Sequence, residues 1–180
     1  MSEQEGVKKA RLDRPELIHR LLTPVDIDAC MEVDRTLGVS TWSVDQYRRS
    51  MRVNPTNNWP FTMHTRYVGA FVGERLCGYV SLRVTLKKNK IMELFMENIA
   101  VSRDHQRTGI GQSLMKKMMD LANEYPDAPI VLYVRAENAG AIALYTRFGF
   151  QITNTEKMVG NYAPEKSGKV LNYEMTHHRK

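Results

Sequence analysis

The stretch HQRTGIGQSL, residues 105–114, places two glycines one residue apart at the start of an apolar-periodic segment. The apolar residues that follow recur with the 3.6-residue period of a helix and are Ile110, Leu114, Met118 and Leu121. Each glycine costs a helix roughly 1 kcal/mol relative to alanine. Gly109 and Gly111 therefore indicate a place where bare backbone is needed. Backbone N–H groups at the start of a helix, reinforced by the helix dipole, suit an anionic ligand.

Two common glycine-rich phosphate motifs do not fit this loop. A dinucleotide fingerprint needs a third glycine where the chain has Leu114, and a P-loop needs a lysine that the segment lacks. What remains is a loop with two glycines and the mobile positive charge of Arg107. A glycine-containing turn that simply enters a helix explains the same residues, so the loop alone leaves both interpretations open.

The composition predicts one globular domain without a membrane span. The chain has 180 residues, of which 42% are hydrophobic and 26% charged. No window approaches 18 consecutive apolar residues, and the polar start MSEQEGVKKAR lacks the apolar core of a secretory signal. Cys30 and Cys77 lie in apolar segments without CxxC spacing. We therefore expect reduced core thiols, no metal site and a cytoplasmic protein.

The charge pattern does not point to a nucleic-acid partner. The formal net charge is +6, with basic clusters at residues 8–11, 48–52, 87–90 and 177–180. These clusters have no interleaved aromatic residues and belong to no recognisable nucleic-acid module, so solvated faces explain them. An anionic small-molecule ligand fits the same charge balance.

The order of patterned segments predicts a mixed α/β sheet with helices on both faces. Strands are expected at 16–22, in a hairpin over 66–84, at 90–101 and 128–136, from 150, and at 170–175. Helices are expected at 24–37 after an N-cap at Thr23, from a capping box at Ser43, at 110–121 and at 138–148. The strand–glycine loop–helix–strand unit over 91–134 favours one parallel pair in a mostly antiparallel sheet. The glycine loop then lies at the carboxyl end of a strand, where such sheets bind ligands.

Two motifs in this order resemble the GNAT acyltransferase superfamily. They are QxxGxG at residues 106–111 and NxxAxxxYxxxGF at residues 138–150. The resemblance extends from about Leu17 to Met175 and is greatest to N-terminal protein acetyltransferases of the ribosomal-protein-alanine type. It implies a single GNAT domain over residues 16–177, and the polar composition of residues 1–15 predicts a disordered basic leader before it. In that fold one parallel strand pair splays around the cofactor, acetyl-CoA, and no metal takes part.

The resemblance also implies which residues contact acetyl-CoA. Ile99, Ala100 and Val101 would pair with the pantetheine chain as if it were an added strand. The pyrophosphate would bind the loop formed by Gln106, Arg107, Thr108, Gly109, Ile110 and Gly111. Asn138 matches an asparagine that contacts the cofactor, and it also suits the N-cap of its helix. The splay requires one strand to turn away from the other, often through a β-bulge.

Three residues are candidates for the acid and base chemistry. Tyr145 matches the family tyrosine that faces the thioester sulfur and would be the general acid, although its place on an apolar stripe also suits a core tyrosine. Many bacterial relatives carry a glutamate where this chain has Tyr133. Because Glu97 lies two residues before Ile99, we expect it on the same strand face and assign it as the base. Tyr133 would position a water molecule or relay a proton.

Trp42 and Tyr162 match elements that flank a peptide N-terminus in this branch, although ordinary edge packing would also explain them. The expected acceptor is the N-terminal α-amine of a protein, whose reference pKa of about 7.7–8.0 lies well below that of a lysine, about 10.4. The alternatives are a lysine side chain or a small amine such as a polyamine or antibiotic. A third hypothesis is a catalytically weak subunit that binds acetyl-CoA. Only one sequence feature favours it, which is the tyrosine at position 133 in place of the glutamate of many relatives.

Overall fold

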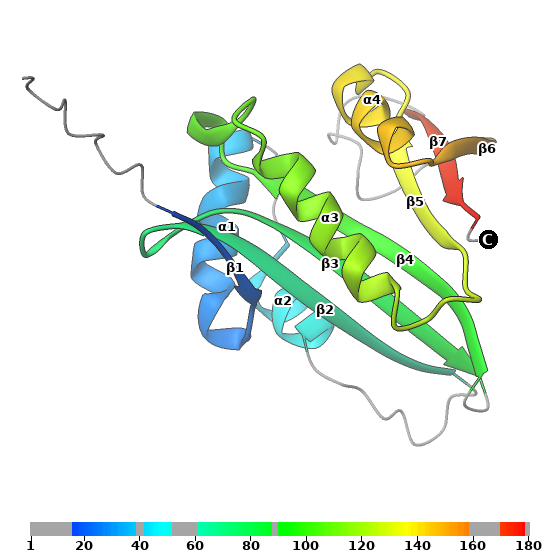
Figure 1. The fold of residues 1–180 in the computed structure, drawn as a ribbon, viewed down its shortest axis with the longest axis horizontal. Helices are drawn as coiled ribbons and strands as arrows, with labels where there is room; N and C mark the ends of the chain where they lie inside the picture. Colours follow the sequence, from blue (N-terminus) through cyan, green and yellow to red (C-terminus); the bar gives the residue numbers. More distant parts are fainter. Residues whose placement is uncertain (1–15, 39–41, 52–60, 88–89, 159–169, 179–180) are drawn as a thin grey trace, which may run out of the picture.

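One mixed sheet of seven strands runs through the protein. The computed structural model describes residues 16–38, 42–51, 61–87, 90–158 and 170–178. The strand order is β1-β2-β3-β4-β5-β7-β6, and within it only β4 and β5 run parallel to each other (Figure 1). The bounds of the strands are β1 Leu17–Leu21, β2 Phe61–Val72, β3 Arg75–Lys87, β4 Lys90–Val101, β5 Ile130–Arg135, β6 Gln151–Met158 and β7 Val170–His177.

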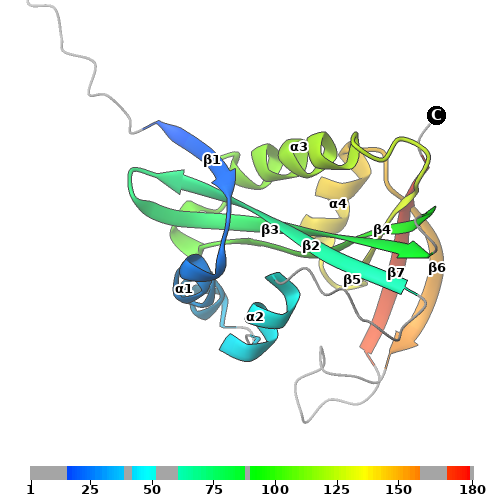
Figure 2. The ribbon, with the colours of Figure 1, turned by 90° about the horizontal axis from the view of Figure 1, so that it is seen from below.

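Helices cover both faces of this sheet, as the sequence predicts (Figure 2). On one face lie α1 (Ile27–Leu37), which follows the 3-10 turn η1 (Pro24–Asp26), and α2 (Val44–Met51). On the other face lie α3 (Ile110–Ala122) and α4 (Ala139–Arg147); the 3-10 turn η2 (Arg103–His105) precedes α3. Each helix pair buries its own hydrophobic core against the sheet. The predicted mixed sheet with one parallel pair and helices on both faces is therefore confirmed. The expected leader of residues 1–15 lies outside the described residues.

Local hydrogen bonds explain where the helices begin. At α2, the Gln46 N–H donates to Ser43 Oγ at 3.3 Å and the Ser43 N–H donates to Gln46 Oε1 at 2.7 Å, which is the capping box that the sequence predicts. Before α1, the Thr23 N–H donates to the Asp26 carboxylate at 2.9 Å. These caps satisfy N–H groups that a helix start leaves without intrahelical partners.

A buried polar cluster holds α1 and α2 against the sheet. Asp34 of α1 is 6% exposed and accepts hydrogen bonds from the hydroxyls of Tyr47 at 2.6 Å and Tyr79 at 2.8 Å. Burial raises the pKa of Asp34, while the two hydroxyl donors oppose this change. Both hydroxyls thereby find a partner inside the core, which a buried polar group requires. The cluster links one residue from each of the two helices with one from β3.

The parallel pair β4–β5 is short and then opens. The strands pair only at Leu94–Ile130 and Phe95–Val131, although β4 continues to Val101 and β5 to Arg135. Figure 1 shows the two strands diverging from that point. The pairing of β3 with β4 also shifts between Leu82–Met96 and Ser81–Asn98, which leaves Glu97 as the extra residue of a β-bulge. A bulge bends its strand and increases the local twist, so it favours the splay that the sequence analysis expected.

Candidate active site

The glycine loop between β4 and α3 has an unusual backbone. Arg107 has φ 63° and Gly109, which precedes the first residue of α3, has φ 93°, so both lie in the left-handed region. The side chain of Gln106 donates to the Val101 carbonyl at 3.2 Å and that of Thr108 to the His105 carbonyl at 2.6 Å. The first bond ties the loop to the end of β4, and the second closes a turn within the loop. The first N–H groups of α3 have no intrahelical partners, so the start of this helix can bind an anion.

The two glycines of the loop have different physical requirements. A Cβ at Gly109 would meet nothing within 4 Å, but the positive φ disfavours any residue with a side chain. A Cβ at Gly111 would lie 3.7 Å from Leu144 of α4 and 3.9 Å from Val101, which are ordinary contacts. The backbone conformation therefore requires glycine at 109, while position 111 has room for a methyl group.

The splay leaves part of β4 as an open edge. Beyond Phe95, β4 has no paired residue on β5, so the backbone of Ile99, Ala100 and Val101 borders the opening. On its other side the same segment pairs with β3, which keeps it extended. An extended amide chain can add to such an edge by main-chain hydrogen bonds. The loop and this edge fit the pyrophosphate and the pantetheine arm of acetyl-CoA, and these contacts remain a prediction.

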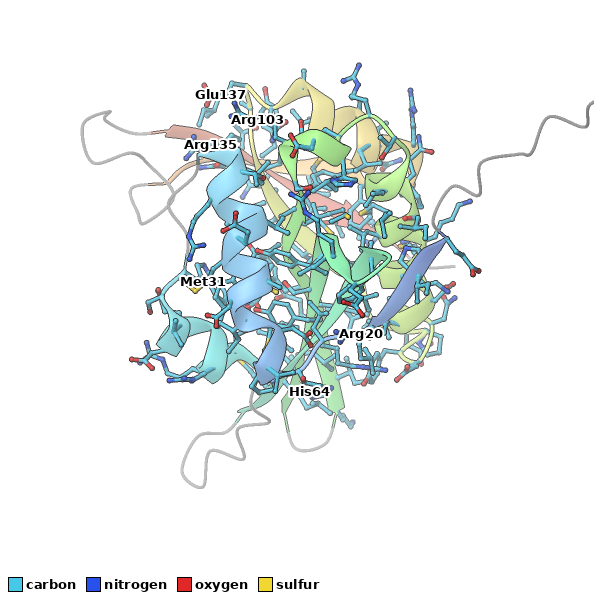
Figure 3. All side chains as sticks on the ribbon, turned by 90° about the vertical axis from the view of Figure 1, so that its left-hand side faces the viewer. Arg20, Met31, His64, Arg103, Arg135 and Glu137 are labelled. Atoms are coloured by element: carbon cyan, nitrogen blue, oxygen red, sulfur yellow. The ribbon has the colours of Figure 1, made fainter. Side chains whose placement is uncertain are left out.

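The carboxyl ends of β4 and β5 lie toward the same end of the molecule, although the strands diverge before they reach it. Figure 3 shows Arg103, which follows β4, at the same end as Arg135 and Glu137, which end and follow β5. Arg135 and Glu137 approach each other to 3.7 Å. Asn138 then begins α4, and its side chain accepts the Ala141 N–H at 3.1 Å. The N-cap role predicted for Asn138 is confirmed, and its contact with the cofactor remains a prediction.

Tyr145 lies on the buried side of α4. It is 5% exposed, and its ring lies 6.1 Å from that of Phe150. Burial raises the pKa of the Tyr145 hydroxyl, so the group keeps its proton at neutral pH. The residue thus belongs to the core, as one interpretation of the sequence had it, and still holds a proton that it can donate.

The structure corrects the predicted orientation of Glu97. Ile99 packs against the core on the α3 side, whereas the Glu97 carboxylate contacts Ser50 of α2 on the opposite face. The two-residue spacing misleads because the bulge at Glu97 inserts an extra residue and resets the alternation of side chains.

The Glu97 carboxylate is also occupied. It forms an ion pair with Arg83 at 2.7 Å, and its second oxygen accepts from Ser50 Oγ at 3.3 Å and Thr65 Oγ1 at 3.5 Å. The side chain of Glu97 is 9% exposed. This largely buried carboxylate therefore already has a partner at each of its oxygens: a cation at one and two hydroxyl donors at the other.

Tyr133 lies on the same face of the sheet as Glu97. Its ring is 5.6 Å from that of Phe95, and its hydroxyl donates to Glu174 Oε2 at 3.1 Å. Glu174 is the residue of β7 directly opposite Tyr133, and its other oxygen accepts from Thr153 Oγ1 at 2.9 Å. No local pattern in the sequence marks Glu174, because the pairing register of β5 with β7 joins residues that are 41 positions apart.

Of the two residues expected beside the acceptor, Trp42 and Tyr162, the structure describes only Trp42. Trp42 packs against the core under α1 and α2, with its ring 5.6 Å from that of Tyr47. Tyr162 lies outside the described residues. A substrate-binding role for both remains a prediction.

Other features of the described residues bear on the sequence predictions. Both cysteines are buried free thiols, as expected. No group of three or more His, Cys, Asp or Glu side chains in the described segments is arranged to hold a metal ion. None of the helices in this part of the chain is both long enough and apolar enough to cross a membrane.

Comparison with known proteins agrees with this geometry. Residues 28–150 match the family described as Acetyltransferase (GNAT) family. The chain belongs to this family. GNAT enzymes use acetyl-CoA as their acetyl donor. The fold is similar to that of the ribosomal-protein-S18-alanine N-acetyltransferase from Escherichia coli, with a TM-score of 0.73, 23% identity and coverage of 92% of this chain and 95% of that one.

Two relatives are similar in sequence. The N-alpha-acetyltransferase RimI of Mycobacterium tuberculosis is 30% identical over 132 residues, which are 72% of this chain and 75% of that protein. The [Ribosomal protein bS18]-alanine N-acetyltransferase of Escherichia coli K12 is 40% identical over 77 residues, 43% of this chain and 50% of the relative. A third relative, a protein of Mycobacterium leprae, is 27% identical over 146 residues, and this matched region is 37% of the length of that protein.

The different requirements of the two loop glycines give a direct test. We expect Gly109→Ala to weaken acetyl-CoA binding about tenfold or more, because the left-handed conformation costs a residue with a side chain roughly 1–2 kcal/mol. Gly111→Ala should weaken binding less than Gly109→Ala does, since its methyl group meets only ordinary contacts within the protein. Isothermal titration calorimetry with acetyl-CoA measures both. Equal affinities for the two variants would contradict this account of the loop.

Proposed function

We propose that this protein transfers the acetyl group of acetyl-CoA to the N-terminal α-amine of a protein. The observation that carries the proposal is the opening between β4 and β5. It joins the glycine loop and Tyr145 on one side of the sheet to the polar face with Glu97, Tyr133 and Glu174 on the other. The names of the two relatives described above support an N-terminal acceptor.

Acetyl-CoA would bind along a path that starts at the loop. The N–H groups around Gly109 and the charge of Arg107 would hold the pyrophosphate. The edge of β4 at Ile99–Val101 would hold the pantetheine arm, and Asn138 would contact it from the start of α4. The bound donor supplies an acetyl thioester, and Tyr145 donates a proton to the sulfur that leaves.

The acceptor amine must lose its charge before it attacks. An α-amine has a reference pKa of about 7.7–8.0, so a sizeable fraction is neutral near physiological pH, whereas a lysine at about 10.4 is almost entirely charged. The carboxylate of Glu97, the extra residue of the bulge in β4, already forms an ion pair with Arg83. Because this carboxylate is engaged by a cation, the site favours an α-amine, which needs less help to lose its proton than a lysine side chain does. The buried free thiols support a cytoplasmic substrate.

A panel of acceptors tests the proposal. The protein is incubated with acetyl-CoA and peptides with a free N-terminus, the same peptides with a blocked N-terminus and an internal lysine, and a polyamine. We expect acetylation of the free α-amine, located by mass spectrometry, and at least tenfold slower reaction of the others. Acetylation confined to lysine or to the polyamine would contradict the N-terminal assignment.

Tyr145 provides a second prediction. Tyr145→Phe keeps the ring that fills the core and removes the proton donor, so turnover should fall about 10²–10⁴-fold while acetyl-CoA affinity changes less than about twofold. Tyr125→Phe is the matched control, because Tyr125 hydrogen-bonds His64 at 3.3 Å on the α3 side, away from the opening. A Tyr145→Phe variant with turnover within twofold of the wild type would reduce Tyr145 to a packing residue.

A further inference from the structure

Tyr133 and Glu174 form a hydrogen-bonded pair at the point where the sheet opens. Tyr133 lies two residues beyond Val131, which is the last residue of β5 that pairs with β4. Its neighbours Leu132 and Val134 are buried in the core on the α3 side, so the Tyr133 side chain points to the opposite face. There it is 38% exposed, and its hydroxyl donates to Glu174 Oε2 at 3.1 Å. The pair therefore lies beside the opening and within reach of solvent.

We propose that Glu174 of β7 receives the proton of the acceptor amine through the hydroxyl of Tyr133. This inference rests on the proposed function, since it needs an amine at the opening between β4 and β5. Tyr133 would be the catalytic residue that touches the amine, and Glu174 the positioning residue that orients the hydroxyl and takes its proton.

The surroundings of the two carboxylates favour Glu174 over Glu97. Glu97 has Arg83 as a cationic partner. Among the described residues, the side-chain partners of Glu174 are the hydroxyls of Tyr133 and Thr153, which carry no charge. Oε2 of Glu174 is held at hydrogen-bond distance from the exposed Tyr133 hydroxyl, whereas both oxygens of Glu97 are engaged by Arg83, Ser50 and Thr65. Glu174 is thus the carboxylate that the geometry connects to the opening through Tyr133.

The orientation of the hydroxyl is fixed from several sides. Phe95 packs against the Tyr133 ring at 5.6 Å, and the register of β5 with β7 places Glu174 directly opposite. Thr153 is the extra residue where the pairing of β6 with β7 shifts, and its hydroxyl donates to Glu174 Oε1 at 2.9 Å. The two oxygens of the carboxylate therefore each accept from a different hydroxyl, which holds Oε2 toward Tyr133.

The charged and titratable groups on this face come from the sheet and from the two helices that cover it. Toward the opening they are Arg83 of β3, Glu93 and Glu97 of β4, Tyr133 and Arg135 of β5, and Glu174 of β7. Under α1 and α2 the same face also holds the titratable side chains of Asp34, Tyr47, Tyr67 and Tyr79. Arg83 forms its ion pair with Glu97, and Arg135 approaches Glu137 to 3.7 Å.

The proposed step balances as follows in protons and electrons. The bound ammonium gives one proton to the Tyr133 oxygen, while the Tyr133 proton passes to Glu174 Oε2. The neutral nitrogen then forms the C–N bond with the acetyl carbon, the C–S bond breaks, and the sulfur keeps the electron pair and takes the proton of Tyr145. The nitrogen loses its remaining excess proton to water. Water then restores the proton of Tyr145, and Glu174 releases its own to solvent.

The pH dependence of Glu174→Gln tests this step. At pH 7 we expect kcat/KM for the acceptor to fall about 10–100-fold, with acetyl-CoA affinity within about twofold of the wild type. The deficit should shrink at least fivefold by pH 9, because an α-amine with a pKa of about 8 then reaches the site already neutral. Glu174→Asp should recover part of the activity. Tyr133→Phe should show the same profile, and the double variant should be no slower than the slower single variant.

Glu124→Gln is the matched control, since Glu124 pairs with Arg66 at 2.6 Å after the end of α3 and should leave the profile unchanged. A Glu174→Gln variant with the wild-type profile would overturn the relay. An equal loss at every pH would do so too, because it would indicate a structural role. The profile is measured with whichever acceptor the panel identifies. If the acceptor assignment is wrong, the wild-type protein will acetylate another amine in the panel. If the relay is wrong, only the pH profiles of the variants will differ from the expected result.

Discussion

The short pairing between β4 and β5 is the constraint on which the rest of the site depends. Two residue pairs hold the parallel strands together, and beyond them each strand follows a different neighbour. A longer ladder would satisfy the backbone of Ile99–Val101 and close the sheet. The open ladder instead leaves hydrogen-bonding groups for an extended ligand and connects the two faces. The bulge at Glu97 supports this geometry, because it bends β4 just after the last paired residue.

The two faces of the sheet then have separate tasks. On the α3 side, the core of apolar residues holds the glycine loop and Tyr145 in place, and burial keeps the Tyr145 hydroxyl protonated. On the other side, α1 and α2 are fixed by the hydrogen bonds of Asp34 and cover only part of the sheet. Toward β5 and β7 this face carries the Tyr133–Glu174 pair. A donor on one side and an amine on the other would meet at the opening.

Local sequence signals predict much of this structure. The capping box at Ser43, the N-cap at Asn138 and the helical period of α3 depend on residues three or four positions apart, so the sequence contains all that is needed to find them. The face of Glu97 could not be found in this way, since a single inserted residue in β4 reverses the alternation and leaves no local mark. Glu174 was missed for a related reason. Its partner is set by the register of two strands that are far apart in the chain.

Hydrogen–deuterium exchange with and without acetyl-CoA tests the central claim most directly, because it reports on the backbone that the opening exposes. The account predicts that peptides covering residues 98–112 gain protection when acetyl-CoA is added, since main-chain groups of β4 and the glycine loop would acquire partners. Peptides from α1 should exchange as before. Unchanged exchange over residues 98–112 under saturating acetyl-CoA would contradict the claim that the open edge of β4 and the loop after it receive the donor.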